Sequence, residues 1–481
     1  MANRPPNVLF ILADDMGPWA LRCAGNPEIH TPHLDSLAAN GLRYDQFFCA
    51  SPVCSPARAT LLTGNMPSQH GVHDWIAGGN THTSWDYAGN QQAIRYLEGQ
   101  RGYPEVLAEA GFDTALCGKW HLGDAHHAQM GFHHWKVHAT GGGPYYGAPL
   151  VQGDSVVPAP GYITERITDQ ALEWLEQRKK PEAPFYLAIH YTAPHSPWGR
   201  EQHPPEFYDP FFENCPFSSL PGLAPPPGWV RNVNIPVPDE ATRRSYLSGY
   251  FAAIAAMDDQ IGRVLRWLEA RGLREETLIV FTSDNGMCMG QHGVYGKGNA
   301  TSPVNFFEES IQVPFIVSHP GSIPAGGVAS SLRSQYDFLP TLLDYLGLGE
   351  ARRHFPKSPG RSFAEEWRTG NTTSADEPVY VYDEYGPARM IRTRRWKWIR
   401  RFSFGADELY DLEKDPGENR NLATRPEYDD TRKSLDHRLE SFFNALDLRP
   451  DRDGRHQDVR GSGQVDLSGQ PGAFLQKHPE K

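Results

Sequence analysis

The stretch NVLFILADD, Asn7 to Asp15, carries the pattern that decides the fold. Its first seven residues, Asn7 to Ala13, form a continuous apolar run with β-branched members. That pattern is typical of a strand that is buried on both faces of a parallel sheet. Two aspartates follow directly. Because ligands of open α/β sheets bind at the carboxyl ends of the strands, these carboxylates are the first candidates for a functional site.

Apolar strand patterns alternate with helical patterns over the next 350 residues or so. Thr31 is predicted to cap the first helix, with Pro32 at its first helical position. We predict further helices from Thr164 and from about Asp239 to Ala270, and further strands at 184–191, 277–282 and 313–318. This alternation predicts an α/β domain built on a large mixed, mostly parallel sheet that is flanked by helices.

The composition becomes polar near residue 370, which divides the chain. We expect a catalytic domain over 1–370, a small α+β domain on an antiparallel sheet over 377–448, and an extended or disordered tail over 449–481. Within the small domain, RTRRWKW (392–398) is basic and aromatic. Its alternation on a strand favours a solvated sheet face over a nucleic-acid site.

The net charge of −12 argues against a broad surface for nucleic acid or anionic membrane, so an anionic substrate needs a local basic pocket. Six cysteines are too few and too scattered for a disulfide framework. No apolar stretch approaches the roughly 20 residues of a membrane span. The amino terminus reads as a strand, which favours a cytoplasmic protein, or a periplasmic or secreted one if a signal peptide was trimmed.

Oxygen ligands follow two of the predicted strands. Asp14 and Asp15 end the first, and Asp284 and Asn285 in TSDNG end the strand at 277–282. Either pair alone is compatible with an ordinary turn or helix cap. Together they offer hard oxygen ligands without Cys or His, which suits calcium or magnesium better than zinc.

Six short motifs occur in a characteristic order: ADD (13–15), CSPAR (54–58), GKWHLG (118–123), APHSP (193–197), SDNG (283–286) and HGVYGKG (292–298). This set resembles the formylglycine-dependent (type I) sulfatases of the alkaline phosphatase superfamily. ELYDLEKDPGENRNL (408–422) looks like the small C-terminal domain of that family. The resemblance implies an alkaline phosphatase-like fold for the large domain.

In that family the cysteine of CxPxR is oxidised to Cα-formylglycine, which implies this modification at Cys54. The hydrated aldehyde has two hydroxyl groups: one attacks sulfur, and the other then loses its proton so that sulfate is expelled. The resemblance implies metal ligation by Asp14, Asp15, Asp284, Asn285 and modified residue 54. The ion is usually calcium, with magnesium the less expected choice.

The remaining catalytic roles are also implied by the resemblance. Arg58 would orient the diol, and Lys119 would bind sulfate oxygens. Lys119 and His121 alternate along an extended segment, so that Trp120 would turn away from the pocket. His121 would take the proton from the second hydroxyl. His195 and Lys297 would contact the bridging oxygen and the sulfate, one or both acting as general acid.

Other residues carry weaker signals. His70 and His292 are candidate substrate contacts, although an equal alternative is that they hold loops in place. Trp75 and Trp85 offer flat faces for a sugar or aryl ring. Five histidines at 126, 127, 133, 134 and 138 crowd one segment, but no matching carboxylate or cysteine set accompanies them, so we do not expect a second metal site there.

The sequence thus predicts a sulfuric ester hydrolase acting on a sulfated carbohydrate, or next on a small aryl sulfate. Its expected partners are that sulfated substrate and a maturing enzyme, either a formylglycine-generating or an anaerobic sulfatase-maturating enzyme. A phosphonate monoester or phosphodiester hydrolase with the same nucleophile is one alternative. A catalytically inert, calcium-dependent glycan binder is another.

Overall fold

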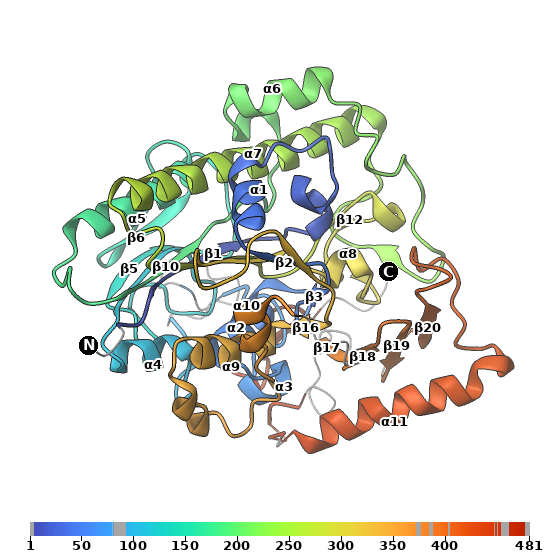
Figure 1. The fold of residues 1–481 in the computed structure, drawn as a ribbon. Helices are drawn as coiled ribbons and strands as arrows, with labels where there is room; N and C mark the ends of the chain where they lie inside the picture. The colour runs from blue at the N-terminus through green and yellow to red at the C-terminus, as the bar shows by residue number, and fades with distance from the viewer. Residues whose placement is uncertain are drawn as a thin grey trace.

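A computed structural model describes residues 4–78, 80, 93–371, 377–383, 388–402, 405–446, 448–449, 451–453 and 461–476. A ten-stranded mixed sheet lies at its centre (Figure 1). Its strands, in order across the sheet, are β15 (Gly327–Ala329), β2 (Leu42–Tyr44), β14 (Phe315–Ser318), β10 (Thr277–Ser283), β1 (Asn7–Ala13), β8 (Phe185–His190), β4 (Asp113–Lys119), β5 (His134–His138), β6 (Pro149–Gln152) and β7 (Ser155–Pro158).

The five central strands, β10, β1, β8, β4 and β5, run parallel, and antiparallel pairing begins at β14 on one side and at β6 on the other. This is the predicted mixed, mostly parallel sheet. Alternate residues of β1 pack into two different cores: Phe10 lies in one and Ile11 in the other. The apolar run at 7–13 is therefore continuous because both faces of β1 are covered.

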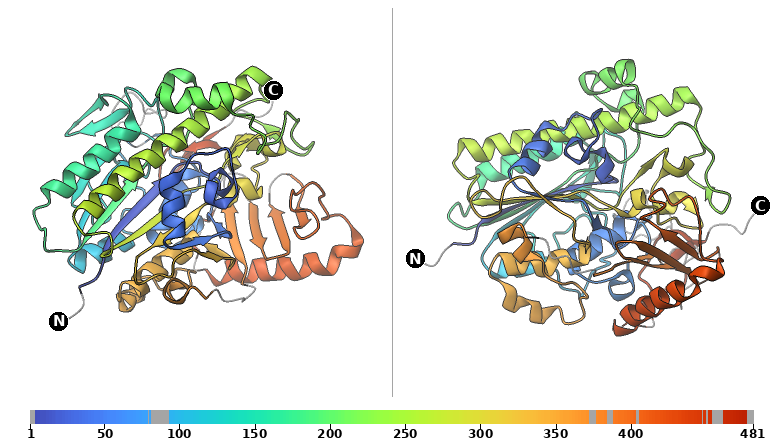
Figure 2. Two further views of the ribbon diagram at one scale, coloured as in Figure 1. Left: turned by 45° about the horizontal axis from the view of Figure 1, so that its top comes forward. Right: turned by 45° about the vertical axis from the view of Figure 1, so that its right-hand side comes forward.

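Helices cover both faces of the sheet (Figures 1 and 2). One face carries α1 (Pro32–Ala39), α5 (Ile163–Gln177) and α7 (Glu240–Ala270), with α6 (Pro205–Asn214) packed on α7. The other face carries α2 (Cys54–Thr63), α4 (Tyr103–Glu109), α9 (Gln335–Tyr345) and α10 (Ala364–Thr369). Across the described ranges, no helix combines the length and the apolar character that crossing a membrane requires.

Helix α1 begins as predicted, with Thr31 at the N-cap position and Pro32 first in the helix, but the Thr31 side chain makes no capping hydrogen bond. Instead, the carboxylate of Asp258 in α7 accepts hydrogen bonds from His33 N (3.0 Å) and Leu34 N (2.8 Å). A carboxylate with two oxygens satisfies two free N–H groups of the first turn at once, and tertiary packing brings it there.

The C-terminal region forms an antiparallel sheet of β17 (Val379–Asp383), β18 (Ala388–Arg392), β19 (Trp396–Arg401) and β20 (Glu408–Asp411). Helix α11 (Asp429–Ala445) packs on one face of it, as both views in Figure 2 show. The other face packs against the large domain, since Val381 and Met390 belong to the core beneath the main sheet.

The expectation of a solvated basic face at 392–398 is wrong for β19, because α11 covers one face of this sheet and the large domain covers the other. The side chain of Lys397 is fully buried, and its Nζ lies 2.5 Å from Glu418 Oε1 and 2.8 Å from Glu308 Oε1. Lys397 lies on the face that the large domain covers, so the lysine is buried together with carboxylates that neutralise it.

Short elements complete the chain: α3 (Pro67–His70), α8 (Glu308–Ile311), and the strand pairs β3 (Phe47–Phe48) with β16 (Arg333–Ser334), β9 (Arg231–Asn232) with β13 (Thr301–Ser302), β11 (Cys288–Met289) with β12 (Tyr295–Gly296), and β21 (Gly461–Gln464) with β22 (Phe474–Gln476). The last pair lies within the tail, where the sequence showed no periodicity. The division of the chain into domains remains a prediction.

Candidate active site

A cavity of about 820 Å³ is lined by five of the predicted catalytic and metal-ligating residues. These are Asp15, Cys54, His121, His195 and Lys297. They come from segments that follow β1, β4, β8 and β10 and from the start of α2. The cavity thus lies at the carboxyl end of the parallel strands, where the α/β fold places ligands.

The acidic residues form one buried group. Ala13 of β1 is paired with Ser283 of β10, so the residues that follow each strand are neighbours. Asp14, Asp15 and Asp284 are all buried, and each offers a carboxylate oxygen within 4.8 Å of the others. Asn285 Nδ2 donates to Asp15 Oδ1 (2.9 Å). The parallel pairing of two sequence-distant strands therefore brings the predicted oxygen ligands together.

Each of these carboxylates is paired with a cation. Lys119 Nζ lies 2.6 Å from Asp14 Oδ2, Lys297 Nζ lies 2.5 Å from Asp15 Oδ1, and Arg58 Nε lies 2.8 Å from Asp284 Oδ2. Burial alone would raise the pKa of Asp284, but the cations, Arg58 foremost, lower it below its ordinary value. Burial alone would lower the pKa of Lys297, but Asp15 foremost raises it. Burial, and next the charge of Asp284, raises the pKa of Asp14 well above its ordinary value, although Lys119 opposes this. The group is consequently an array of paired acidic and basic side chains in which Asp14 is the carboxyl group that is hardest to ionise.

The oxygens of this group fit a hard divalent cation. Asp14 Oδ1 and Asn285 Oδ1 are buried and take part in no hydrogen bond within the described part of the chain. Buried oxygens are normally satisfied, so two orphaned ones beside three carboxylates are the donor set that calcium prefers. Asp15 also has a left-handed backbone (φ 66°), a strained conformation that clusters at functional sites.

Cys54 is the first residue of α2 and lines the cavity. All ten residues of α2 are buried, and its N-terminus is directed at the reacting centre, where free N–H groups favour an anion. Arg58 follows one turn later and donates from Nη1 to the Lys119 carbonyl oxygen (3.0 Å). The helix therefore places residue 54 and the guanidinium in fixed relation to the end of β4.

His121 faces residue 54. Its Nδ1 lies 3.4 Å from Cys54 Sγ, and its Nε2 lies 3.0 Å from the Ile76 carbonyl oxygen. A carbonyl oxygen only accepts, so Nε2 carries the proton and the lone pair of Nδ1 points at residue 54. Burial, and next the charge of Lys119, lowers the pKa of His121 well below its usual range. The neutral imidazole is thus arranged as a proton acceptor.

Two neighbours of His121 behave differently. Trp120 turns away as predicted and packs edge to face on Trp135, with ring centroids 5.1 Å apart. Lys119 is fully buried beside Asp14 and is not among the described residues that line the cavity. The segment 119–121 therefore presents His121 to the cavity and Lys119 to the carboxylates.

His195 borders the cavity near Asp15. Its Nε2 lies 3.7 Å from Asp15 Oδ2, and its Nδ1 donates to the Ser196 carbonyl oxygen (2.7 Å). Burial lowers the pKa of His195 to about 4. His195 and Lys297 thus approach the cavity from the same side, next to one carboxylate.

Sequence reasoning missed the part played by Gly141 and Gly142. A Cβ on Gly141 would lie 2.1 Å from ring atoms of His121, and one on Gly142 would lie 2.9 Å from His195 Cε1. The absence of side chains at both positions is what admits the two imidazole rings. The run of three glycines at 141–143 was the available signal.

The weaker candidates separate into two groups. Trp75 lines the cavity, whereas His70 and His292 do not appear among its described lining residues. His70 Nδ1 accepts a hydrogen bond from Val72 N (3.1 Å), and its Nε2 contacts Thr60 Oγ1 (3.1 Å). These contacts hold the loop after α3 in place against α2. Trp85 lies outside the described residues.

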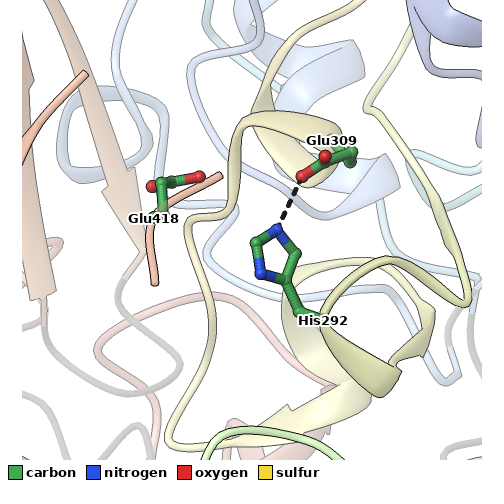
Figure 3. Close-up of side chains that lie close together, drawn as sticks. All are labelled: His292, Glu309 and Glu418. Atoms are coloured by element: carbon green, nitrogen blue, oxygen red, sulfur yellow. Dashed lines mark hydrogen bonds and ion pairs between the residues drawn. The ribbon is translucent and has the colours of Figure 1, made fainter. Parts of the chain in front are cut away.

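His292 belongs to a separate cluster, shown in Figure 3. Its ring stacks on Phe307, and its Nε2 lies 3.0 Å from Glu309 Oε2. Glu418 brings a third ligand-type atom within 4.8 Å, but that carboxylate already pairs with buried Lys397. Because Glu418 is already paired with a buried lysine, we assign this cluster to the contact between the large and small domains.

The histidines at 126–138 do not contact one common partner. His127 pairs with Asp124, His133 contacts Thr114, and His138 contacts Thr140. Within the described ranges, none of the five histidines belongs to a group of three potential metal ligands.

Comparison with models of known protein families shows the family of this chain. The sulfatase family model matches residues 6–348, and a model of the C-terminal region of N-sulphoglucosamine sulphohydrolase matches residues 290–445. The chain is 28% identical to N-acetylglucosamine-6-O-sulfatase of Bacteroides thetaiotaomicron, covering 91% of this chain and 86% of that protein. It is 29% identical to an ulvan-active sulfatase of Formosa agariphila, covering 92% and 81%.

Among solved structures, the fold is similar to one described in complex with its substrate D-glucosamine-2-N,6-O-disulfate. The TM-score is 0.74 at 25% sequence identity, and the match covers 92% of this chain and 99% of that one.

Proposed function

This chain belongs to the sulfatase family and is a sulfuric ester hydrolase, and we propose that it cleaves a sulfate ester of a carbohydrate to an alcohol and inorganic sulfate. The observation that carries the proposal is the charge array around residue 54. Three cations and three carboxylates meet beside the N-terminus of α2, at one end of a cavity large enough for a sugar.

Two groups are proposed to complete the site. Asp14, Asp15, Asp284 and Asn285, with the side chain of residue 54, would hold calcium, and a maturing enzyme would convert Cys54 to formylglycine. When present, calcium supplies Lewis-acid stabilisation of the sulfate oxygens, and formylglycine supplies the attacking hydroxyl. The orphaned oxygens of Asp14 and Asn285 support this assignment.

The residues of the chain bind and orient the sulfate group. Lys297, Arg58 and Lys119 place positive charge on the side of the cavity that contains residue 54, and the free N–H groups of α2 add to it. Such fixed donors stabilise charge on a transferring anionic group without reorganisation during the reaction. The three cations and the three carboxylates cancel, so a bound divalent ion would make the site locally positive and suited to a sulfate ester in a protein of net charge −12.

Proton transfer is assigned to three side chains. His121 would accept a proton at Nδ1 from the side chain of residue 54, since Ile76 occupies Nε2. His195 and Lys297 would contact the bridging oxygen. Lys297 would donate a proton to the leaving alcohol, whereas His195 would do so only once Nε2 is protonated, because its Nδ1 proton is donated to the Ser196 carbonyl oxygen.

The substrate class is proposed from the cavity wall and the relatives. Trp75 and Trp198 contribute aromatic surface to the wall, which suits the face of a sugar ring. The named relatives act on N-acetylglucosamine-6-sulfate and on ulvan, as their names state. A small aryl sulfate is the second choice.

A direct test measures inorganic sulfate released from a panel of defined sulfated mono- and oligosaccharides. A second panel compares an aryl sulfate, an aryl phosphate and an aryl phosphonate monoester that share the same leaving group. Mass spectrometry of the peptide that contains residue 54 reports whether that residue is cysteine or formylglycine. We expect sulfate release that correlates with the aldehyde fraction. Faster cleavage of the phosphate or phosphonate would favour the alternative hydrolase, and an unmodified thiol in protein from its native host would contradict the mechanism.

A further inference from the structure

A segment of the cavity wall is paired with a strand from the C-terminal tail. The backbone N–H of Gln464 in β21 donates to the Trp75 carbonyl oxygen (2.8 Å), and the Gln464 carbonyl accepts from Ala77 N–H (2.9 Å). Ile76, between these two, forms a parallel β-bridge with Gln464. Trp75, Ile76 and Ala77 all line the cavity. The tail therefore supports this part of the active-site wall by strand pairing.

The side chain of Gln464 strengthens the connection. It is fully buried, and its Oε1 accepts from His73 N (2.9 Å) while its Nε2 donates to the carbonyl oxygens of Gly71 (2.9 Å) and Asp466 (3.1 Å). A buried amide whose donor and acceptor atoms are both satisfied has one stable orientation. Gln464 thus holds the segment 71–77 from both its main chain and its side chain.

Ile76 connects this held segment to the reacting centre. Its N–H donates to Ser55 Oγ (3.1 Å), beside Cys54, and its carbonyl accepts from His121 Nε2 (3.0 Å). The second contact leaves His121 Nδ1 unprotonated and directed at residue 54. The position of one peptide carbonyl therefore determines both the tautomer and the direction of the imidazole ring.

We propose that Gln464 is a positioning residue for the hydrolysis: it holds segment 71–77 so that the Ile76 carbonyl orients His121 toward residue 54. Gln464 touches no reacting group and acts through Ile76. This inference rests on the function proposed above for His121. It gives the C-terminal tail a role in catalysis, although the tail lies about 390 residues along the chain from the segment it supports.

The test compares Gln464→Ala with Gln470→Ala, which changes an exposed glutamine of the same tail. Three experiments are carried out on the full chain: amide hydrogen exchange of residues 71–77, the ¹⁵N shifts of the His121 ring at fixed pH, and steady-state kinetics that give kcat and the inhibition constant of inorganic sulfate. The first two use protein in which residue 54 is still cysteine, so they do not depend on maturation.

For Gln464→Ala we expect roughly tenfold faster exchange at His73 and Ala77. The His121 ring should lose its pattern of protonated Nε2 and unprotonated Nδ1, and kcat should fall about 10- to 100-fold because a small misplacement of a catalytic group is costly. Inhibition by sulfate should stay within about twofold, since the cations are untouched. Gln470→Ala should match the unsubstituted protein in all three.

A second variant reaches the same contact by another route. A Cβ on Gly463 would lie 2.5 Å from Ala77 Cβ, so Gly463→Ala should push the tail strand away and reproduce the pattern with Gln464 intact. Faster exchange at 71–77 with unchanged kcat in either variant would overturn the proposal, as would unchanged exchange in both. If the unsubstituted enzyme releases no sulfate, the proposed function fails, whereas exchange and ring shifts still decide whether the tail positions His121.

Discussion

Lys119 Nζ lies 2.6 Å from Asp14 Oδ2, and neither side chain is exposed to solvent. The same arrangement recurs between Arg58 and Asp284 and between Lys297 and Asp15. A buried charge destabilises a protein unless an opposite charge accompanies it. The three pairs consequently support the fold and the sulfate site together, and changing one member should affect both.

Replacing Lys119 by Met should destabilise the fold as well as reduce turnover. The variant leaves the Asp14 carboxylate buried without its nearest cation, which costs about 3–5 kcal/mol of unfolding free energy. The loss of a fixed cation should lower kcat/KM by about 100-fold or more. Urea unfolding and sulfate release measure the two effects. Lys433→Met, at an exposed position of α11, is the control, and a Lys119→Met protein within 1 kcal/mol of it would contradict the prediction.

Calcium should stabilise the folded protein through the acidic group. A ligand that binds only the folded state at 100 times its dissociation constant adds about 2.7 kcal/mol, which raises the unfolding temperature. Chelation should reverse the shift, and Asp284→Asn should remove most of it because one carboxylate ligand is lost. Thermal unfolding with and without calcium measures this. Asp259→Asn, in α7 and away from the acidic group, should keep the full shift; a calcium shift equally large in Asp284→Asn would place the ion elsewhere.

A methyl group at Gly141 should displace His121. The added Cβ would lie 2.1 Å from ring atoms, so the imidazole must move away from residue 54. We expect Gly141→Ala to lower kcat about 100-fold with little change in unfolding free energy. Steady-state kinetics and urea unfolding test this. Gly222→Ala, which meets no atom within 4 Å, is the matched control, and near-normal kcat in Gly141→Ala would show that His121 tolerates another position.

Asp258 should make stability depend on pH. Burial raises its pKa from 3.8 to about 7 against the lowering effect of hydrogen bonds from His33 N and Leu34 N, and the nearby carboxylates of Asp35 and Asp259 raise it further. Between these values the folded protein binds more protons than the unfolded chain. The stabilisation is therefore complete below pH 3.8 and lost as the pH rises through about 7.

Asp258→Asn removes this titration. From pH 5 to pH 8 the unfolding free energy of the variant should gain about 2–3 kcal/mol relative to the unsubstituted protein, at about 1.4 kcal/mol per pH unit. Urea unfolding at a series of pH values measures the difference. Asp154→Asn, at an exposed position, is the control, and parallel pH profiles for Asp258→Asn and the unsubstituted protein would refute the prediction.

The central strands and the order of the site motifs were predictable from the sequence because their signals are local. An apolar run such as 7–13 needs two covered faces wherever it occurs, and a carboxylate that follows such a strand lies at the ligand-binding edge of the sheet. Residues that lie one helical turn apart in one motif, such as Cys54 and Arg58, are on the same side of the helix wherever that helix forms. The strands and the helical spacing follow from backbone periodicity, whereas the roles of Cys54 and Arg58 were implied by the resemblance to the sulfatase family.

Contacts between distant segments were decided only by the tertiary structure. The helix cap from Asp258, the room left by Gly141, the burial of Lys397 and the pairing of Gln464 with Trp75 and Ala77 each join residues far apart in the chain. No pattern in one segment encodes its partner in another: the glycine run at 141–143 is visible in the sequence, but the imidazole rings that it admits are not. The amino-acid sequence by itself determined the strand core and the chemistry available to the site, and three-dimensional packing determined which groups hold His121 and the charge array in place.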